Sequence, residues 1–137
     1  MAWAALPILL LVVPHGTTAS VTAQRGATLV AGTFRRVEAG YGGAARISRR
    51  GTALRLRIAL SFKRRPTCDL DGVLLASPEG YTVRSGDGPV LILRPAGNGF
   101  DLAYVDPAHR PWQVDYCLLG TGIDGHYRRV RPGGPGR

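Results

Sequence analysis

The fold is decided by the stretch LRLRIALSF, residues 54–62. Five apolar side chains alternate here with two arginines and two small residues, so one face is continuously apolar and the other is basic or small. This period of two is typical of a β-strand that is buried on one side. A helix through the same residues would wind Arg55 and Arg57 into the apolar stripe. We therefore predict a half-buried strand in this stretch.

Shorter segments with similar alternation recur along the chain, at the spacing of an all-β domain. Because short glycine-containing connections separate them, sequential strands are expected to pair antiparallel as a meander. The turns are expected at Ala39–Gly43, Arg50-Gly51, Pro78–Gly80, Gly86–Gly88 and Gly97–Gly99. The strands are predicted at Leu29–Val37, Ala44–Arg49, Thr52–Phe62, Cys68–Ala76, Tyr81–Arg84, Val90–Arg94, Phe100–Val105, Gln113–Leu119 and His126–Arg131.

Eight or nine short antiparallel strands must deal with the two edges of their sheet. A closed or partly closed β-barrel removes the edges, and a β-sandwich, the alternative, shortens them. Two segments favour the barrel: GTFRRV at residues 32–37 and GHYRRV at residues 125–130 share a Gly-x-aromatic-Arg-Arg-Val pattern. Matched strands at the two ends of a meander can pair and close it, although coincidence in a chain rich in Gly and Arg also explains the match.

The beginning of the chain differs from the rest. Residues 1–13 carry no charged side chain, and their apolar run has the length of a signal-peptide core and is too short for a membrane anchor, although no Lys or Arg precedes it. A buried N-terminal helix is the alternative, but the run lacks a polar face. We expect a cleavable leader over residues 1–23 with cleavage after Ala19 or Ala23, a single β domain over residues 24–131, and a disordered basic tail over residues 132–137.

The two cysteines, Cys68 and Cys117, both follow the expected leader. An even number of cysteines in an exported chain indicates a disulfide. A bridge between these two closes a loop of about 50 residues and stabilises the fold by about 4 kcal/mol in the chain-entropy model. The sequence has no C-x-x-C motif, and no histidine lies near either cysteine, so we expect neither a redox site nor a zinc site. We therefore expect a disulfide and a periplasmic or secreted location.

Basic charge is the strongest compositional signal, with 18 Lys and Arg against nine Asp and Glu and a net charge of +9. Nearly all of it is arginine, a bias that indicates a GC-rich bacterial genome. Such a surface attracts anionic partners over a long range, and a solvated basic surface without a ligand is the alternative. The basic side chains that crowd the strands and turns near the two ends of the domain are Arg35, Arg36, Arg49, Arg50, Arg55, Arg57, Lys63, Arg64, Arg65, Arg128 and Arg129.

Catalytic motifs are not evident in the sequence. It has no Gly-x-Ser-x-Gly, no acidic loop with calcium spacing and no ligand set for zinc, so we expect no enzyme, no cofactor and no metal site. His126 lies two residues after Asp124 and is interpreted as a plain surface histidine. Asp69 and Asp71 share one strand face, where a surface ion-pair region beside the basic residues explains them better than a glycosidase pair does.

The loop DPAHRPW, residues 106–112, is the most chemically diverse connection in the chain. Two prolines stiffen it, and a stiff polar loop beside a tryptophan is a candidate binding lip. The alternative is a long hairpin connection with proline at both ends, which needs no functional reason. The candidate binding residues are thus His109, Arg110 and Trp112 in the loop, with Arg55, Arg57, Arg128 and Arg129 on the strands.

Three functions fit these features. The first is a non-enzymatic binding module for an anionic envelope component or a protein partner. We expect this protein to be a monomer, with peripheral membrane contact allowed. Its exported location argues against a nucleic acid. The second is a hydrolase inhibitor, because size, leader, disulfide and barrel form resemble those of the small periplasmic lysozyme inhibitors, a resemblance of architecture only. The third is a calycin-type carrier of a small apolar ligand, which needs an open barrel interior.

Overall fold

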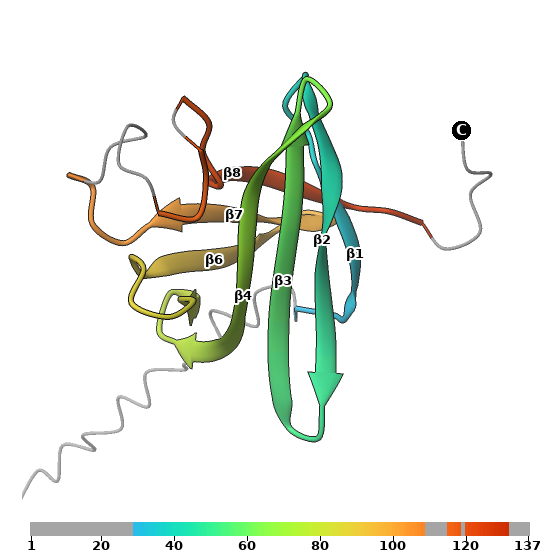
Figure 1. Cartoon of the computed structure of the whole chain (residues 1–137). Helices are drawn as coiled ribbons and strands as arrows, with labels where there is room; N and C mark the ends of the chain where they lie inside the picture. Colours follow the sequence, from blue (N-terminus) through green and yellow to red (C-terminus); the bar gives the residue numbers. More distant parts are fainter. Residues whose placement is uncertain (1–28, 109–114, 119, 132–137) are drawn as a thin grey trace, which may run out of the picture.

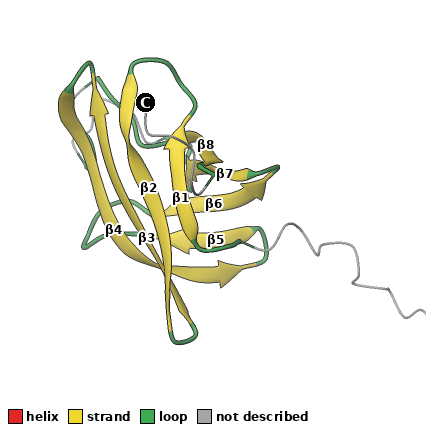
Figure 2. Cartoon of the chain, turned by 90° about the vertical axis from the view of Figure 1, so that its right-hand side faces the viewer, coloured by secondary structure: helices red, strands yellow, loops and turns green. Residues whose placement is uncertain are grey.

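A computed structural model of the chain describes residues 29–108, 115–118 and 120–131. This described part contains strands and loops only (Figure 2). None of its residues lies in a helix long and apolar enough to cross a membrane. Its strands are β1 (Gly32–Arg36), β2 (Tyr41–Arg50), β3 (Ala53–Phe62), β4 (Arg65–Ser77), β5 (Gly80–Val83), β6 (Leu91–Ala96), β7 (Gly99–Tyr104) and β8 (Gly125–Arg129).

Each strand pairs antiparallel with the next, and β1 pairs with β8, so the eight strands of the described residues form a closed barrel. The prediction of an all-β meander closed into a barrel is confirmed, and the sandwich alternative is not adopted. In Figure 1 the long strands β2, β3 and β4 run upright, and β6, β7 and β8 cross the view. Closure joins the two matched segments, with Phe34 opposite Arg129, Arg35 opposite Arg128 and Arg36 opposite Tyr127.

Three predicted strand starts need correction, and the first is that of β1, which begins at Gly32 and not at Leu29. Strand β2 begins at Tyr41, inside the expected glycine-rich turn, and β4 begins at Arg65, three residues before the predicted start. The β3–β4 turn is therefore Lys63-Arg64, and both residues have positive φ, at 48° and 69°. Positive φ at both central positions matches the twist of a hairpin, but non-glycine side chains are strained there. Nothing in the composition of Lys63-Arg64 marks a two-residue turn, so the sequence pattern predicted a longer connection, over residues 63–67.

The strand predicted at Gln113–Leu119 is wrong for the residues that the structure describes. Residues 115–118 form only an isolated bridge, in which Cys117 lies opposite Cys68. Two backbone hydrogen bonds flank it: Asp69 N–H donates to the Tyr116 carbonyl at 2.8 Å, and Leu118 N–H donates to the Thr67 carbonyl at 2.8 Å. The remaining positions, 113, 114 and 119, lie outside the described residues.

The predicted disulfide joins Cys68 of β4 to Cys117 of this segment. Tyr116 provides a second attachment, because its hydroxyl donates to the Pro89 carbonyl at 2.8 Å and accepts from the Ser85 N–H at 3.0 Å. Its ring lies so close to Gly88 that a Cβ there would meet it at 2.6 Å. The segment is therefore held against the barrel on two sides, at β4 and at the β5–β6 connection.

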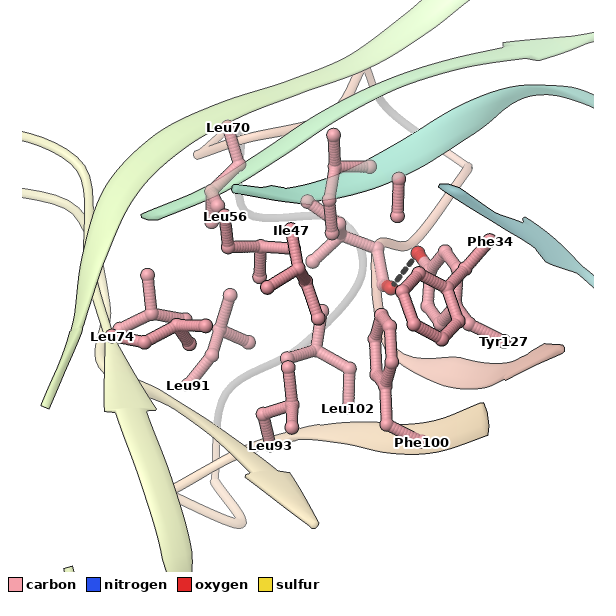
Figure 3. Close-up of a cluster of buried hydrophobic side chains, with 14 of the residues drawn as sticks. Phe34, Ile47, Leu56, Leu70, Leu74, Leu91, Leu93, Phe100, Leu102 and Tyr127 are labelled. Carbon is pink, nitrogen blue, oxygen red and sulfur yellow. Dashed lines mark hydrogen bonds between the residues drawn. The ribbon is translucent and has the colours of Figure 1, made fainter. Parts of the chain in front are cut away.

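Inward-facing side chains of the strands form one hydrophobic cluster (Figure 3). Of the five apolar positions of residues 54–62, the four from Leu54 to Leu60 face inward and are buried, and Phe62 is half-buried against the Tyr41 ring. Three aromatic rings pack where β1, β7 and β8 meet: Phe34 lies edge-on to Phe100 at 5.0 Å, and Phe100 stacks on Tyr127 at 4.8 Å. The buried Tyr127 hydroxyl donates to the Ile123 carbonyl at 2.6 Å, the hydrogen bond dashed in Figure 3. Burial thus raises the pKa of Tyr127 above its usual range.

Replacing Lys63-Arg64 by Asn-Gly is expected to stabilise the fold by about 1 kcal/mol, because Asn and Gly adopt positive φ at less cost than Lys and Arg. Urea unfolding monitored by circular dichroism measures the change. The single variant Arg65→Gly, one residue outside the turn, is the control and should not stabilise. A double variant that is less stable than the wild type would contradict the described turn.

Tyr127→Phe is expected to cost about 1–2 kcal/mol, because the Ile123 carbonyl loses its donor inside the protein. The tyrosine should also govern alkaline unfolding. Its hydroxyl stays protonated in the folded state, whereas in the unfolded chain it ionises near the ordinary value of 10.0, so stability is lost as pH rises through 10. Urea midpoints between pH 8 and 11 should therefore fall less steeply for Tyr127→Phe than for the wild type. Equal slopes would contradict the burial of this hydroxyl.

Candidate functional site

The outward faces of β1, β2 and β3 carry arginines at neighbouring positions. Ala45 and Ile47 are buried, so the residue between them, Arg46, faces outward. The register places Arg46 directly opposite Arg57 of β3. On the other side of the same surface, Arg35 of β1 lies opposite Arg128 of β8. Four strands that are consecutive around the barrel thus each present at least one outward arginine.

A concavity of about 700 Å³ lies among these strands. Arg35, Arg36, Arg46 and Arg57 line it. The other lining residues are small or only partly polar, and none carries a negative charge: Thr33, Tyr41, Gly42, Gly43, Ala44, Ala59 and Val130. Arginine side chains therefore surround the floor of the concavity, which is made largely of glycine and alanine.

Gly43 is a floor residue that can only be glycine. Its φ is +83°, and a Cβ at this position would lie 2.1 Å from the Ala59 carbonyl oxygen. Both the backbone conformation and the close approach of β3 require glycine here. The sequence Gly42-Gly43-Ala44 therefore leaves the side of β2 that faces the arginines without bulky side chains.

Arg35, Arg46 and Arg57 are exposed, and among the described residues none of them forms an ion pair. Other outward arginines differ, since Arg55 contacts Asp71 at 2.6 Å and Arg94 contacts Glu79 at 2.8 Å. Like charges on facing positions of adjacent strands repel one another. The three guanidinium groups therefore create a positive potential in the concavity.

Asp71 limits the positive potential at the β4 side. Its carboxylate accepts a hydrogen bond from Arg55 Nε, which holds the pKa of Asp71 below its ordinary value, and the charges of Arg57 and Arg50 act in the same direction. The expected ion-pair region around Asp69 and Asp71 is confirmed for Asp71. Since Asp71 lies opposite Arg57 in the register, it is the carboxylate nearest to the concavity along that row of the sheet.

Arg36 closes the β1 end of the concavity and is 8% exposed. Its guanidinium lies 4.0 Å from the centre of the Tyr41 ring. One terminal nitrogen donates to Glu38 at 2.6 Å, and the other donates to the Gly122 carbonyl. The third nitrogen, Nε, is buried without a hydrogen-bond partner in the described structure. Arg36 is therefore rigidly held at this end of the barrel.

The structure separates the strand arginines that the sequence predicted as binding residues. Arg57 lines the concavity and Arg128 is exposed beside it, but Arg55 is engaged by Asp71. Arg129 is a correction: it is half-buried, donates to the Ala31 carbonyl at 2.9 Å and lies 5.9 Å from the Phe34 ring. It holds the segment that precedes β1 and does not belong to the exposed face.

The predicted loop residues His109, Arg110 and Trp112 lie outside the described residues. His126 pairs with Asp101 of the neighbouring strand, with Nδ1 2.7 Å from the carboxylate oxygen, and not with Asp124. Its side chain is exposed, as expected for a surface histidine. Within the described ranges no group of three or more metal-ligating side chains comes together.

Arg46 is the main residue that sequence reasoning missed. The signal was present, because alternation around Ala45 and Ile47 turns Arg46 outward, and the two-residue turn after Arg50 sets it opposite Arg57. The sequence reasoning also missed that the Arg36 side chain is buried. It follows Phe34 by two positions and therefore shares the inward face of β1.

Comparison of the chain with protein-family models, with curated proteins and with solved structures finds no match. The site is therefore interpreted from its own geometry.

Asp71→Asn is expected to raise the affinity for an anionic polymer such as heparin about threefold, because it removes the negative charge beside Arg57 and releases Arg55. Isothermal titration at low salt measures the effect. Glu79→Gln, which releases Arg94 on β6 with the same change in net charge, is the matched control. Equal gains in both variants would show that net charge, and not the concavity, governs binding.

Proposed function

We propose that this protein is an exported, non-enzymatic binding module that holds an anionic component of the cell envelope in the concavity of β1, β2 and β3. The observation that carries the proposal is the set Arg35, Arg46 and Arg57, which surrounds a floor of small residues without a carboxylate partner. Guanidinium groups bind carboxylate and phosphate oxygens in a two-pronged geometry, and hydrogen bonds between charged groups are about twice as strong as neutral ones.

The electrostatics of the whole chain support this role. A net charge of +9 attracts an anion over a long range, and a concave surface of one sign raises the local concentration of the opposite charge. The three arginines already lie close together in the folded protein. An anion that reaches them relieves their mutual repulsion, so binding gains both from attraction and from the loss of that repulsion.

The exported location is supported by the Cys68–Cys117 disulfide, which is compatible with an oxidising compartment. The leader expected over residues 1–23 lies outside the described residues. In an exported protein the available polyanions are envelope polymers and lipid headgroups, and we therefore propose these and not a nucleic acid.

The other functions that the sequence suggested gain less support. A carrier of an apolar ligand needs space inside the barrel, whereas the inward side chains of the described strands pack into one buried cluster. A lysozyme-type inhibitor would have to bind basic enzymes, which a cluster of unpaired arginines repels. A protein partner with an acidic surface remains compatible with the concavity and is distinguished by the experiment below.

Binding to heparin and to vesicles that contain anionic lipid is expected to weaken steeply with salt. In the double variant Arg46→Gln/Arg57→Gln the slope of log affinity against log salt should fall by about two, one for each lost charge contact. The control Arg84→Gln/Arg94→Gln carries the same net charge but changes arginines that face Asp87 and Glu79, so its slope should stay near that of the wild type.

Equal slopes for the two double variants would contradict the concavity as the binding site. Affinity that ignores salt in the wild type would contradict the electrostatic proposal altogether. If the anionic polymers and vesicles fail and only an acidic protein binds, the partner is a protein and the envelope component is excluded.

A further inference from the structure

The three exposed arginines of the concavity surround one outward position of the sheet, Ala44 of β2. The register of β1 and β2 places Arg35 beside Ala44. Arg46 follows Ala44 by two positions and shares its face, and Arg57 lies opposite Arg46 on β3. Neighbouring strands are about 4.8 Å apart, and alternate residues of one strand are about 7 Å apart. The three long side chains can therefore reach the same point above Ala44.

The charge and the donors of this cluster fit one kind of anionic group best. Each guanidinium is a planar fork of N–H donors that binds two oxygens at a time, and three of them bring three positive charges. A phosphate monoester has three terminal oxygens and a charge of about −1.5 to −2 at pH 7. Carboxylates, sulfate esters and phosphodiesters each carry a single charge. Attraction to three converging cations therefore favours the phosphate monoester.

The floor beside the cluster leaves room for the group that carries the phosphate. Ala59 lies opposite Ala44 on β3, and Gly42 precedes Ala44 by two positions on β2. All three residues line the concavity, which at about 700 Å³ is larger than one phosphate group fills. In Figure 2 the strands β1, β2 and β3 run side by side. A phosphate above Ala44 can therefore extend into an attached organic group that lies over these small residues.

We propose that the concavity binds a phosphate monoester of a sugar or of a lipid headgroup, with the phosphate above Ala44 bound by Arg35, Arg46 and Arg57. This inference rests on the proposed function and specifies the anionic group that the same site takes. Sugar and lipid sources share this chemistry, and the experiments below distinguish them.

The first test compares anionic groups on the same sugar. Glucose 6-phosphate, glucose 6-sulfate and glucuronate carry a phosphate monoester, a sulfate ester and a carboxylate at one end of the ring. Titration calorimetry at pH 7.5 and low salt is expected to show an affinity for the phosphate at least tenfold higher than for the other two. Equal affinities for the three sugars would overturn the inference.

The second test uses the ionisation of the ligand. The second pKa of a phosphate monoester is about 6, so it is mostly a dianion at pH 7.5 and mostly a monoanion at pH 5.5. We expect glucose 6-phosphate to bind about fourfold more weakly at pH 5.5, in proportion to the lost dianion. Glucose 6-sulfate does not titrate in this range, and its affinity should not fall.

The charged groups of the protein around the site act in the opposite direction. Asp69 and Asp71 lie opposite Ala59 and Arg57, and His126 belongs to β8 beside β1. Any proton that these side chains gain as pH falls makes the surface more positive and strengthens the binding of an anion. The same holds for Glu38, which pairs with Arg36. Weakening on acidification therefore comes from the ligand, and an affinity for glucose 6-phosphate that is equal or higher at pH 5.5 would overturn the inference.

The third test fills the position above which the phosphate lies. Ala44→Leu keeps all three arginines and should lower the affinity for glucose 6-phosphate at least tenfold. Ser48→Leu is the matched control, because Ser48 faces outward on the same strand beyond Arg46 and does not line the concavity. Its affinity should stay within twofold of the wild type. Equal affinities of the two variants would overturn the placement above Ala44, and circular dichroism checks that both are folded.

Vesicles identify the source of the phosphate. Phosphatidic acid presents a phosphate monoester, and phosphatidylglycerol presents a phosphodiester in the same kind of bilayer. Preferred binding to phosphatidic acid with weak binding of glucose 6-phosphate supports a lipid source, and the reverse result supports a sugar source. Absence of a preference for the monoester in both comparisons would overturn the inference.

The same titrations separate the two proposals. Salt-sensitive binding of heparin that depends on Arg46 and Arg57, without a preference for phosphate monoesters, would overturn this inference and leave the proposed function in place. Absence of binding by heparin, glucose 6-phosphate and both kinds of vesicle would overturn both.

Discussion

The pairing of β1 with β8 is the constraint on which the rest of the structure depends. It joins segments from the two ends of the described chain and removes the edges of the sheet. It also brings Phe34 and Tyr127 onto Phe100, so the aromatic part of the core exists only in the closed barrel. Two further hydrogen bonds extend the seam, from Val37 N–H to the His126 carbonyl and from Val130 N–H to the Thr33 carbonyl.

The same seam explains the candidate site. Each of the two Arg-Arg pairs is divided by strand alternation, because the first arginine follows an inward aromatic residue and faces outward, and the second faces inward again. Arg35 and Arg128 thus become exposed neighbours. Arg36 and Arg129 turn to the ends of the barrel, where each donates to a backbone carbonyl. The concavity is the consequence of this division together with the glycines of β2.

The strand pattern was predictable wherever one face is continuously apolar, as in residues 54–62, and the matched segments predicted the closure. The same alternation also predicts that Arg46 faces outward and that Arg36 and Arg129 face inward, if it is applied to every residue of β1, β2 and β8. The Lys63-Arg64 turn was not predictable, because its residues normally avoid positive φ and only the pairing of Phe62 with Arg65 imposes it. The contacts of Arg36 depend on Gly122 and Tyr41, which are far apart in sequence, and no local pattern contains that information.

The closure of the barrel is tested most directly by proton NMR across the β1–β8 seam. The account predicts cross-peaks between the Hα atoms of Phe34 and Arg129 and between those of Arg36 and Tyr127, which face each other in the register, together with slow exchange of the Val37 and Val130 amides. The contradicting result is the absence of both cross-peaks and free exchange of both amides, while the cross-peaks between β2 and β3 are intact. The sheet would then be open at this seam, and Arg35 would not lie beside Arg128.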